Sequence, residues 1–290
     1  MPQIYVHIGL PKTATTTLQT QVLMGQAQWV YLGSKLPRVL NTDSDYLLFE
    51  RFVQRGEGSA ESVKKALNAR LASEGKPLMI SEENMSIGSF KGYPKGHPLT
   101  HSRRSKFDRL SDVLEGMDAV ILVGIRSFRS AVFSAFVEYQ EQWLRDDRSP
   151  LELLRSSDVM GMYHYASLRR ELDARWPGRV CALDFTDIVN GRVSFPGFKW
   201  KASQPLPNTR QHGKVDGGVL REVVTKRPFL PLAKRMAFFS PKMAKRLWSV
   251  KRSTEVKVPH WDDEVWLQCA DLETASENAR KEWLGLSDSS

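Results

Sequence analysis

Ile4-Tyr5-Val6-His7-Ile8, followed by Gly9-Leu10-Pro11-Lys12-Thr13-Ala14-Thr15-Thr16-Thr17-Leu18-Gln19, is the stretch that decides the fold. Its first five residues favour β-structure and carry no formal charge, which predicts a short buried strand. Gly9 and Pro11 end that strand. The apolar residues that follow, Leu18, Val22 and Leu23, have helical spacing. The stretch therefore predicts a strand, a tight loop with one lysine, and a helix.

This loop has the features of an anion-binding site. Backbone N–H groups converge in such a turn, and the dipole of the following helix adds partial positive charge. Lys12 adds a full charge. Threonine hydroxyls are expected to cap the first helical turn and to donate to the anion; they belong to Thr13, Thr15, Thr16 and Thr17. We expect the ligand to be a phosphate or a sulfate.

The spacing differs from that of a nucleoside-triphosphate loop, G-x-x-x-x-G-K-[ST], because no second glycine precedes Lys12. Residues 11–18, P-K-T-A-T-T-T-L, instead resemble the 5′-phosphosulfate loop, P-K-[ST]-G-T-T-x-L, of sulfotransferases that use 3′-phosphoadenosine 5′-phosphosulfate (PAPS). Ala14 stands where that family has glycine, and a left-handed backbone there would cost about 1 kcal/mol. The resemblance implies that this loop binds the cosubstrate through Pro11, Lys12, Thr13, Ala14, Thr15, Thr16 and Thr17.

A second anion signal follows the apolar run Ala119–Val123, which predicts a buried parallel strand. Arg126 comes directly after it, at the carboxyl edge where open α/β sheets bind ligands. Ser134 follows inside the next expected helix. An arginine there can hold a phosphate bidentately, and the serine can add a hydrogen bond. PAPS sulfotransferases have a similar R-x₇-S pair, which implies that Arg126 and Ser134 hold the 3′-phosphate.

The acceptor needs a general base, and two carboxylates follow the predicted strand Leu78–Ile80. Glycan and tyrosine sulfotransferases use a glutamate, so the resemblance implies Glu83 as the base, with Glu82 second. It also implies that Arg210, in a loop like one found in bacterial members, approaches the nucleotide. His97 and His101 lie in the basic segment 88–105 and are an alternative base, acceptor-side residues or solvated loop. His7 lies inside a strand, which favours a packed core histidine.

Length and alternation indicate the fold class. The 290 residues are 41% hydrophobic and 26% charged, which suits one large α/β domain or one domain with an appendage. Short apolar strands alternate with longer helices, which predicts a mostly parallel sheet covered on both faces. The resemblance implies a three-layer P-loop NTPase-like sulfotransferase fold. We expect a core over 1–215 and a helical extension over 216–290, or a single domain over 1–290.

The segment Arg221–Lys257 is strongly basic, with eleven lysines and arginines against two glutamates. Apolar residues recur at spacings of three and four, which predicts helices with one basic face, split at Ser240-Pro241. These helices either pack on the core with a solvated basic side or dock on an anionic membrane or polyanion. The net charge of +9 favours anionic partners in general. We expect no specific nucleic acid partner.

Several classes of protein are disfavoured. No apolar run is long enough to span a bilayer, and no leader pattern opens the sequence, which predicts a cytoplasmic protein, with a place at the inner face of a membrane as the alternative. Cys181 and Cys269 lack metal-ligand or disulfide-framework spacing and are expected to be free thiols. No spacing of His, Asp or Glu suggests a metal site.

The leading hypothesis is a PAPS-dependent sulfotransferase that moves a sulfuryl group to a hydroxyl, or second to an amine, of a glycan or lipid acceptor. Its product would be adenosine 3′,5′-bisphosphate. Two other classes stay open. One is a P-loop kinase or NTPase, which would need Mg²⁺-dependent ATP binding. The other is a non-catalytic protein that binds membranes or polyanions through Arg221–Lys257.

Overall fold

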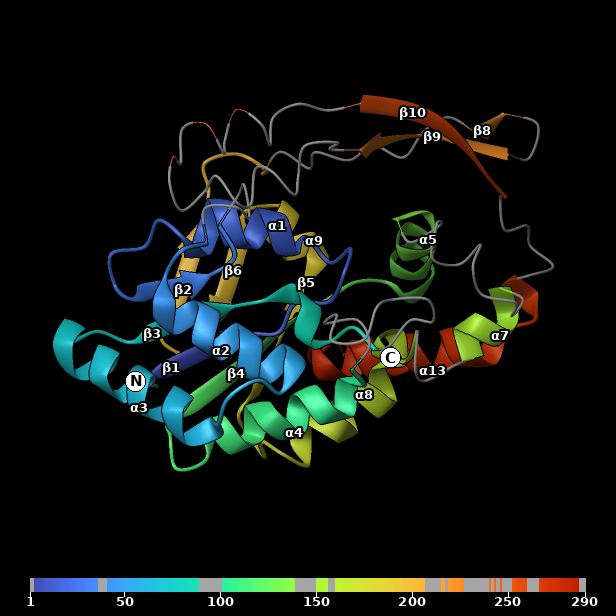
Figure 1. Ribbon diagram of the computed structural model, residues 1–290. Coiled ribbons are helices and arrows are strands. Elements are labelled where there is room, and N and C mark those ends of the chain that lie inside the picture. Colours follow the sequence, from blue (N-terminus) through green and yellow to red (C-terminus); the bar gives the residue numbers. More distant parts are fainter. Residues whose placement is uncertain are drawn as a thin grey trace.

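A five-stranded parallel sheet forms the centre of the computed structural model (Figure 1). The structure describes residues 3–35, 41–88, 101–138, 150–155, 160–206, 215–216, 219–226, 240, 243, 246, 252–259 and 266–286. The strand order is β2-β3-β1-β4-β5, so β1 is central. The strands are β1 (Ile4–His7), β2 (Val30–Gly33), β3 (Leu78–Ser81), β4 (Ala119–Ile125) and β5 (Val180–Asp184). The predicted α/β class with a parallel sheet is confirmed.

Helices cover one face of the sheet. Alternate strand residues, such as Ile4, Val6 and Ile121, join a buried cluster with side chains of these helices, as expected for strands whose side chains alternate between faces. The layer contains α2 (Ser44–Arg55), α3 (Ala60–Glu74), α4 (Arg103–Leu114), α5 (Phe128–Glu138), α8 (Tyr165–Asp173) and α13 (Ala270–Trp283). Two short helices, α7 (Pro150–Arg155) and η5 (Gly161–Tyr163), belong to the connection before α8.

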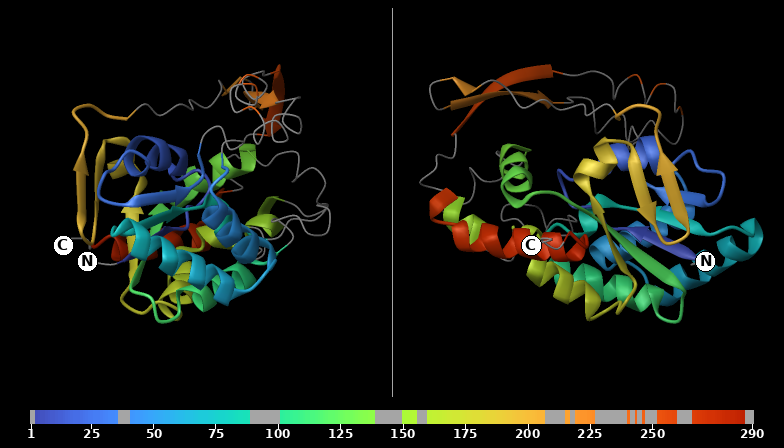
Figure 2. Two further views of the ribbon diagram at one scale, coloured as in Figure 1. Left: turned by 60° about the vertical axis from the view of Figure 1, so that its left-hand side comes forward. Right: turned by 180° about the vertical axis from the view of Figure 1, so that it is seen from behind.

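The other face is covered by a mixture of short helices and a hairpin. Tyr5, Met79 and Leu122 point to this side, where Trp29 packs against Phe195. The covering elements are α1 (Thr15–Thr17), the π-helix η1 (Leu18–Leu23), α9 (Phe185–Val189) and the antiparallel pair β6 (Arg192–Phe195) and β7 (Phe198–Lys201). The sheet therefore lies between two layers, as Figure 2 shows from two further sides.

The sequence determines where the helices begin and end. Asp43 precedes α2, and its carboxylate accepts from the N–H groups of Asp45 and Tyr46 at 3.0 Å, which satisfies groups without helical partners. Gly56 ends α2 with a φ of 73°, a conformation that glycine adopts without strain.

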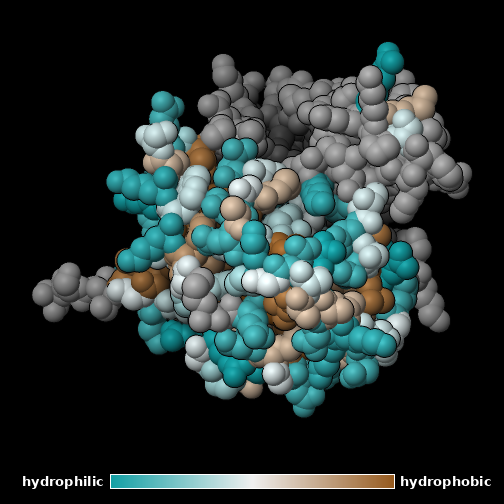
Figure 3. Space-filling view, turned by 90° about the vertical axis from the view of Figure 1, so that its left-hand side faces the viewer, coloured by the Kyte–Doolittle hydropathy of each residue, from teal (hydrophilic) through white to brown (hydrophobic). Residues whose placement is uncertain are grey.

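The face of the molecule near α3 is mostly hydrophilic, with hydrophobic residues in separate spots (Figure 3).

The core has features beyond those that the sequence predicts. β4 runs past the predicted Ala119–Val123, through Gly124 to Ile125. α4 begins at Arg103, directly after its cap Ser102. The strand β2 was not predicted. Nor was the β6–β7 hairpin, whose pairs Val193–Trp200 and Phe195–Phe198 cover the sheet.

The C-terminal segment also departs from the expected helices. β9 (Val219–Lys226) pairs antiparallel with β10 (Arg252–Pro259) and with β8 (Val215–Asp216). β9 and β10 are rich in valine and threonine, which favour extended backbone. The apolar residues with helical spacing lie between these strands, over 232–250, and all of them except Met243 are outside the described residues. This sheet lies outside the core, on the side of α1 and α5 (Figures 1 and 2). Between β9 and β10 the structure describes only Ser240, Met243 and Arg246, and the last two have helical backbone.

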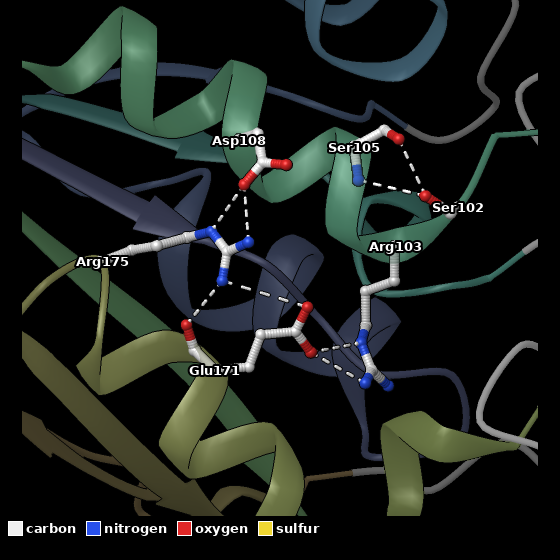
Figure 4. Close-up of polar contacts among 6 residues, drawn as sticks. All are labelled: Ser102, Arg103, Ser105, Asp108, Glu171 and Arg175. Carbon is white, nitrogen blue, oxygen red and sulfur yellow. Dashed lines mark hydrogen bonds and ion pairs between the residues drawn. The ribbon is translucent and has the colours of Figure 1, made fainter.

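An ion-pair network joins α4 to α8 (Figure 4). Glu171 accepts from Arg103 Nε at 3.0 Å and from its Nη2 at 2.8 Å. Arg175 donates to Asp108 on α4 at 2.6 Å, and its Nη1 lies 4.0 Å from Glu171. The side chains of Arg103 and Glu171 are only 10% and 18% exposed, so solvent screens this pair less than a surface pair.

We expect Glu171→Ala to lower the free energy of unfolding by about 2 kcal/mol, because it leaves the Arg103 guanidinium largely buried without its carboxylate. Urea denaturation followed by circular dichroism measures the change. The control is Glu115→Ala, which removes an 82% exposed partner of Lys64 and is expected to cost less than about 0.5 kcal/mol. Equal effects in the two variants would contradict a special role for the network.

Candidate functional site

The loop between β1 and α1 has a strained backbone at two positions. Lys12 has a φ of 64° and Ala14 a φ of 62°, so both lie in the left-handed region that non-glycine residues rarely adopt. Ala14 therefore has the left-handed backbone for which we anticipated a conformational cost of about 1 kcal/mol. Such strain persists only where the surroundings hold the backbone in place.

The threonines of this loop do not act as the sequence suggested. The residue that caps α1 is Ala14, and no side chain caps the helix. Thr13 and Thr15 are buried, and both hydroxyls donate to the carbonyl of Leu10, at 2.8 and 2.9 Å. They close the loop on itself instead of capping the first turn. Thr16 is exposed and Thr17 half-buried.

Close approach to β4 fixes the other side of the loop. A Cβ atom on Gly124 would lie 2.9 Å from Thr13 Oγ1 and 3.2 Å from the carbonyl oxygen of Thr13. Such contacts are shorter than van der Waals separations, so the loop can lie against β4 only because residue 124 has no side chain. Gly124 therefore has a packing role within β4.

The side chain of Arg126 contacts the backbone of Lys12. Arg126 Nη1 donates to the carbonyl of Lys12 at 3.1 Å and to Ser134 Oγ at 3.3 Å. The Phe185 ring lies against the guanidinium, 4.2 Å from Cζ to the ring centroid, a cation–π contact. Burial lowers the pKa of Arg126, and Tyr165 and Tyr163 oppose this shift. The loop after β1 and the residues after β4 are thus joined by the hydrogen bond from the Arg126 guanidinium to the backbone of Lys12.

Two tyrosines that the sequence reading did not single out support this site. Tyr163 donates to the carbonyl of Pro11 at 2.9 Å, and Tyr165 donates to the carbonyl of Arg126 at 2.7 Å. Both are buried. They fix the two backbone segments that carry Lys12 and Arg126. The sequence around these two tyrosines gave no signal of these contacts.

The carboxyl end of β3 carries Glu82 and Glu83, which have different surroundings. Glu82 is 3% exposed. Its Oε2 accepts from Tyr46 Oη and from Ser34 Oγ, the latter at 3.0 Å, and its Oε1 accepts from the N and Nδ2 of Asn84 at 3.0 and 2.8 Å. Glu83 begins the short helix η3 (Glu83–Met85) and is half-exposed. Of the two glutamates, Glu83 is the more accessible to solvent.

A lysine from α4 lies beneath this turn. Lys106 is fully buried, and its Nζ donates to the carbonyls of Asn84 and Ile87 at 3.0 and 2.9 Å. Burial lowers its pKa to about 7, and the charge of Glu82 opposes that shift. The sequence reading missed this residue, because a lysine in an amphipathic helix is usually assigned to the solvent face.

Of the histidines that the sequence analysis considered, His7 and His101 are described. His7 is fully buried, and its Nδ1 shares a hydrogen bond of 2.7 Å with Ser81 Oγ. Burial lowers its pKa to about 3, so the imidazole is neutral at pH 7. Among the described residues, its Nε2 has no hydrogen-bond partner. His101 is half-buried, and burial is the main cause that lowers its pKa.

Some predicted residues lie outside the described part of the chain, namely His97 and Arg210. Within the described ranges, no group of three His, Cys, Asp or Glu side chains could hold a metal ion. Cys181 and Cys269 form no disulfide, in agreement with the sequence analysis. No helix in the described residues is both long and apolar enough to cross a membrane.

A hollow of about 660 Å³ lies beside β5 and the β6–β7 hairpin. Trp200, Lys199 and Lys201 line it together with Asp184 and Asp187. Its lining includes neither Lys12 nor Arg126. It is therefore separate from the candidate anion site, although Phe185, next to Asp184, packs on Arg126.

The chain matches no protein-family model and no curated protein.

Ala14→Gly is expected to raise the free energy of unfolding by about 1 kcal/mol, because glycine adopts a φ of 62° without the steric cost of a Cβ. Thermal and urea unfolding measure the change. As a matched control, Ala66→Gly in the interior of α3 should destabilise by about 0.5–1 kcal/mol; the same sign at both positions would contradict the interpretation.

Proposed function

We propose that this chain is a PAPS-dependent sulfotransferase. The observation that supports it most is the hydrogen bond from Arg126 to the carbonyl of Lys12, since it joins the two segments that resemble the family's 5′- and 3′-phosphate motifs. PAPS carries anionic groups at the 3′ and 5′ positions of one ribose. Two cationic residues that follow adjacent parallel strands suit such a ligand.

In this proposal each residue has a separate task. Lys12 neutralises negative charge at the 5′-phosphosulfate. Arg126, with Ser134 Oγ at 3.3 Å, binds the 3′-phosphate. Phe185 holds its guanidinium in place, and Tyr165 holds its backbone. Glu83 accepts the proton of the acceptor. Glu82 is excluded from that task because both its oxygens already accept hydrogen bonds in the interior.

The reaction is an in-line transfer of a sulfuryl group. The acceptor oxygen forms a bond to sulfur while the bond between sulfur and the bridging phosphate oxygen breaks. The hydroxyl proton passes to Glu83, and the electron pair of the broken bond stays on the 5′-phosphate of adenosine 3′,5′-bisphosphate. As in phosphoryl transfer, catalysis comes mainly from alignment and stabilisation of developing charge. Acceptors that carry hydroxyls, such as glycans or lipids, are the proposed substrates, and an amine is second.

The test combines binding and transfer. Adenosine 3′,5′-bisphosphate at about 100 times its Kd should stabilise the protein by about 2.7 kcal/mol, and ATP with Mg²⁺ should stabilise it less. Transfer of radioactive sulfate from PAPS is then measured against a panel of glycans, lipids and phenols. Stronger stabilisation by Mg²⁺–ATP would favour a kinase or NTPase. Salt-sensitive binding to anionic vesicles without nucleotide binding would favour a membrane-binding protein.

A further inference from the structure

Asn84, the residue after Glu83, is held through both of its peptide groups. Its N–H donates to Glu82 Oε1 at 3.0 Å. Its carbonyl accepts from Lys106 Nζ at 3.0 Å, and the same Nζ donates to the carbonyl of Ile87 at 2.9 Å. Lys106 therefore spans the turn that begins at Glu83, and its ammonium is bonded to the backbone of this turn at two points.

Ser86 joins the same turn to the anion loop. Its hydroxyl is 0% exposed and donates to the carbonyl of Gly9 at 2.7 Å, with the carbonyl of Glu83 at 3.3 Å as a weaker second acceptor. Gly9 itself leaves no room for a side chain, because a Cβ there would lie 2.6 Å from Thr15 Cγ2. The backbone around Glu83 and the loop of Lys12 are thus fixed to each other in the interior.

The helix that carries Lys106 is itself anchored. Arg103 and Asp108, on the same helix, pair with Glu171 of α8 and with Arg175, just after α8 (Figure 4). A lysine in the interior loses the solvation of its charge, and main-chain carbonyls recover part of that loss. A rigid helix, a buried ammonium and two fixed carbonyls limit how far the turn can move.

We propose that Lys106 and Ser86 are positioning residues, which fix the turn of Glu83 against the anion loop and so set the direction of its carboxylate. Lys106 acts from the α4 side and Ser86 from the β1 side. Neither contacts the groups that react. The inference rests on the proposed function only for the role of Glu83 as base, because the contacts to Asn84, Ile87 and Gly9 are independent of any reaction.

The first test is hydrogen exchange, which needs no substrate. The variants are Lys106→Met and Ser86→Ala, and the control is Lys65→Met, which changes an exposed lysine of α3. We expect the peptide over residues 81–87 to exchange at least about tenfold faster in Lys106→Met, and several-fold faster in Ser86→Ala, because local opening becomes easier. The control should match the wild type. Wild-type exchange over 81–87 in both variants would overturn the proposal.

The second test separates positioning from general stability. Both variants should keep the Kd for adenosine 3′,5′-bisphosphate within about twofold, whereas kcat for transfer from PAPS falls about tenfold or more, since small displacements of a catalytic group cost rate. Faster exchange with unchanged kcat would overturn the positioning role. If Lys106→Met does not fold, Ser86→Ala decides by the same criteria. If the wild type transfers no sulfate, the proposed function fails, whereas hydrogen exchange still decides whether these residues hold the turn.

Discussion

Arg126→Ala should weaken the binding of adenosine 3′,5′-bisphosphate at least about 100-fold, which corresponds to about 2.7 kcal/mol. The guanidinium is mostly buried, lies against Phe185 and donates to the backbone of Lys12, so its removal takes away a charge and opens the contact between the two segments. Arg126→Lys should recover only part of the affinity, because an ammonium lacks the planar fork that binds phosphate bidentately. Isothermal titration calorimetry measures both.

Lys12 provides a matched pair of variants on the other side of the site. Lys12→Ala and Lys12→Gly should lose nucleotide affinity to the same extent, because both remove the charge. Only Lys12→Gly should gain stability, by about 1 kcal/mol, since Lys12 has a φ of 64°. An exposed lysine of α3, Lys65, changed to alanine controls for net charge. Wild-type stabilisation by the bisphosphate in Arg126→Ala and in Lys12→Ala would show that the site is misassigned.

Glu83→Gln is expected to reduce kcat for sulfuryl transfer by about 10²–10⁴-fold, the usual contribution of a general base. Glutamine has nearly the same shape but cannot accept the acceptor's proton. The Kd for the bisphosphate should stay unchanged, because Glu83 holds no nucleotide phosphate in this proposal. Single-turnover transfer from PAPS, with bisphosphate binding measured in parallel, gives the two quantities separately.

Glu82→Gln is the natural control for this prediction. Oε1 and Oε2 of Glu82 both accept hydrogen bonds, and an amide nitrogen in either place would face donors. We therefore expect a loss of about 1–3 kcal/mol of stability and a smaller loss of kcat than in Glu83→Gln. Normal turnover in Glu83→Gln together with inactive but stable Glu82→Gln would exchange the assigned roles.

Three residues of the candidate site could be selected from the sequence, because open α/β sheets bind ligands at the carboxyl ends of their strands. Lys12, Glu83 and Arg126 each follow a strand of one parallel sheet, and the ends of such strands share an edge. The contacts that hold these residues could not be predicted in the same way. Lys106 looks like a surface residue of a helix, and only the packing of α4 under the turn after β3 places its ammonium against two carbonyls.

The errors in the fold also have physical causes. Val30–Gly33 is short and follows a turn without a long apolar run, so its role as edge strand β2 depends on pairing with β3. The stretches Val219–Lys226 and Arg252–Pro259 pair with each other across a long separation, and a local spacing of three and four residues gives no information on such pairing.

The central position of β1 in the sheet has a consequence for folding during synthesis on the ribosome. β1 obtains its hydrogen-bonded neighbours only after the residues of β3 and β4, up to Ile125, have been synthesised. At roughly 5–20 residues per second, this delay is on the order of ten seconds. Until then the Ile4–Ile8 segment lacks at least one of its two neighbouring strands, so its apolar side chains stay accessible to chaperones on the nascent chain.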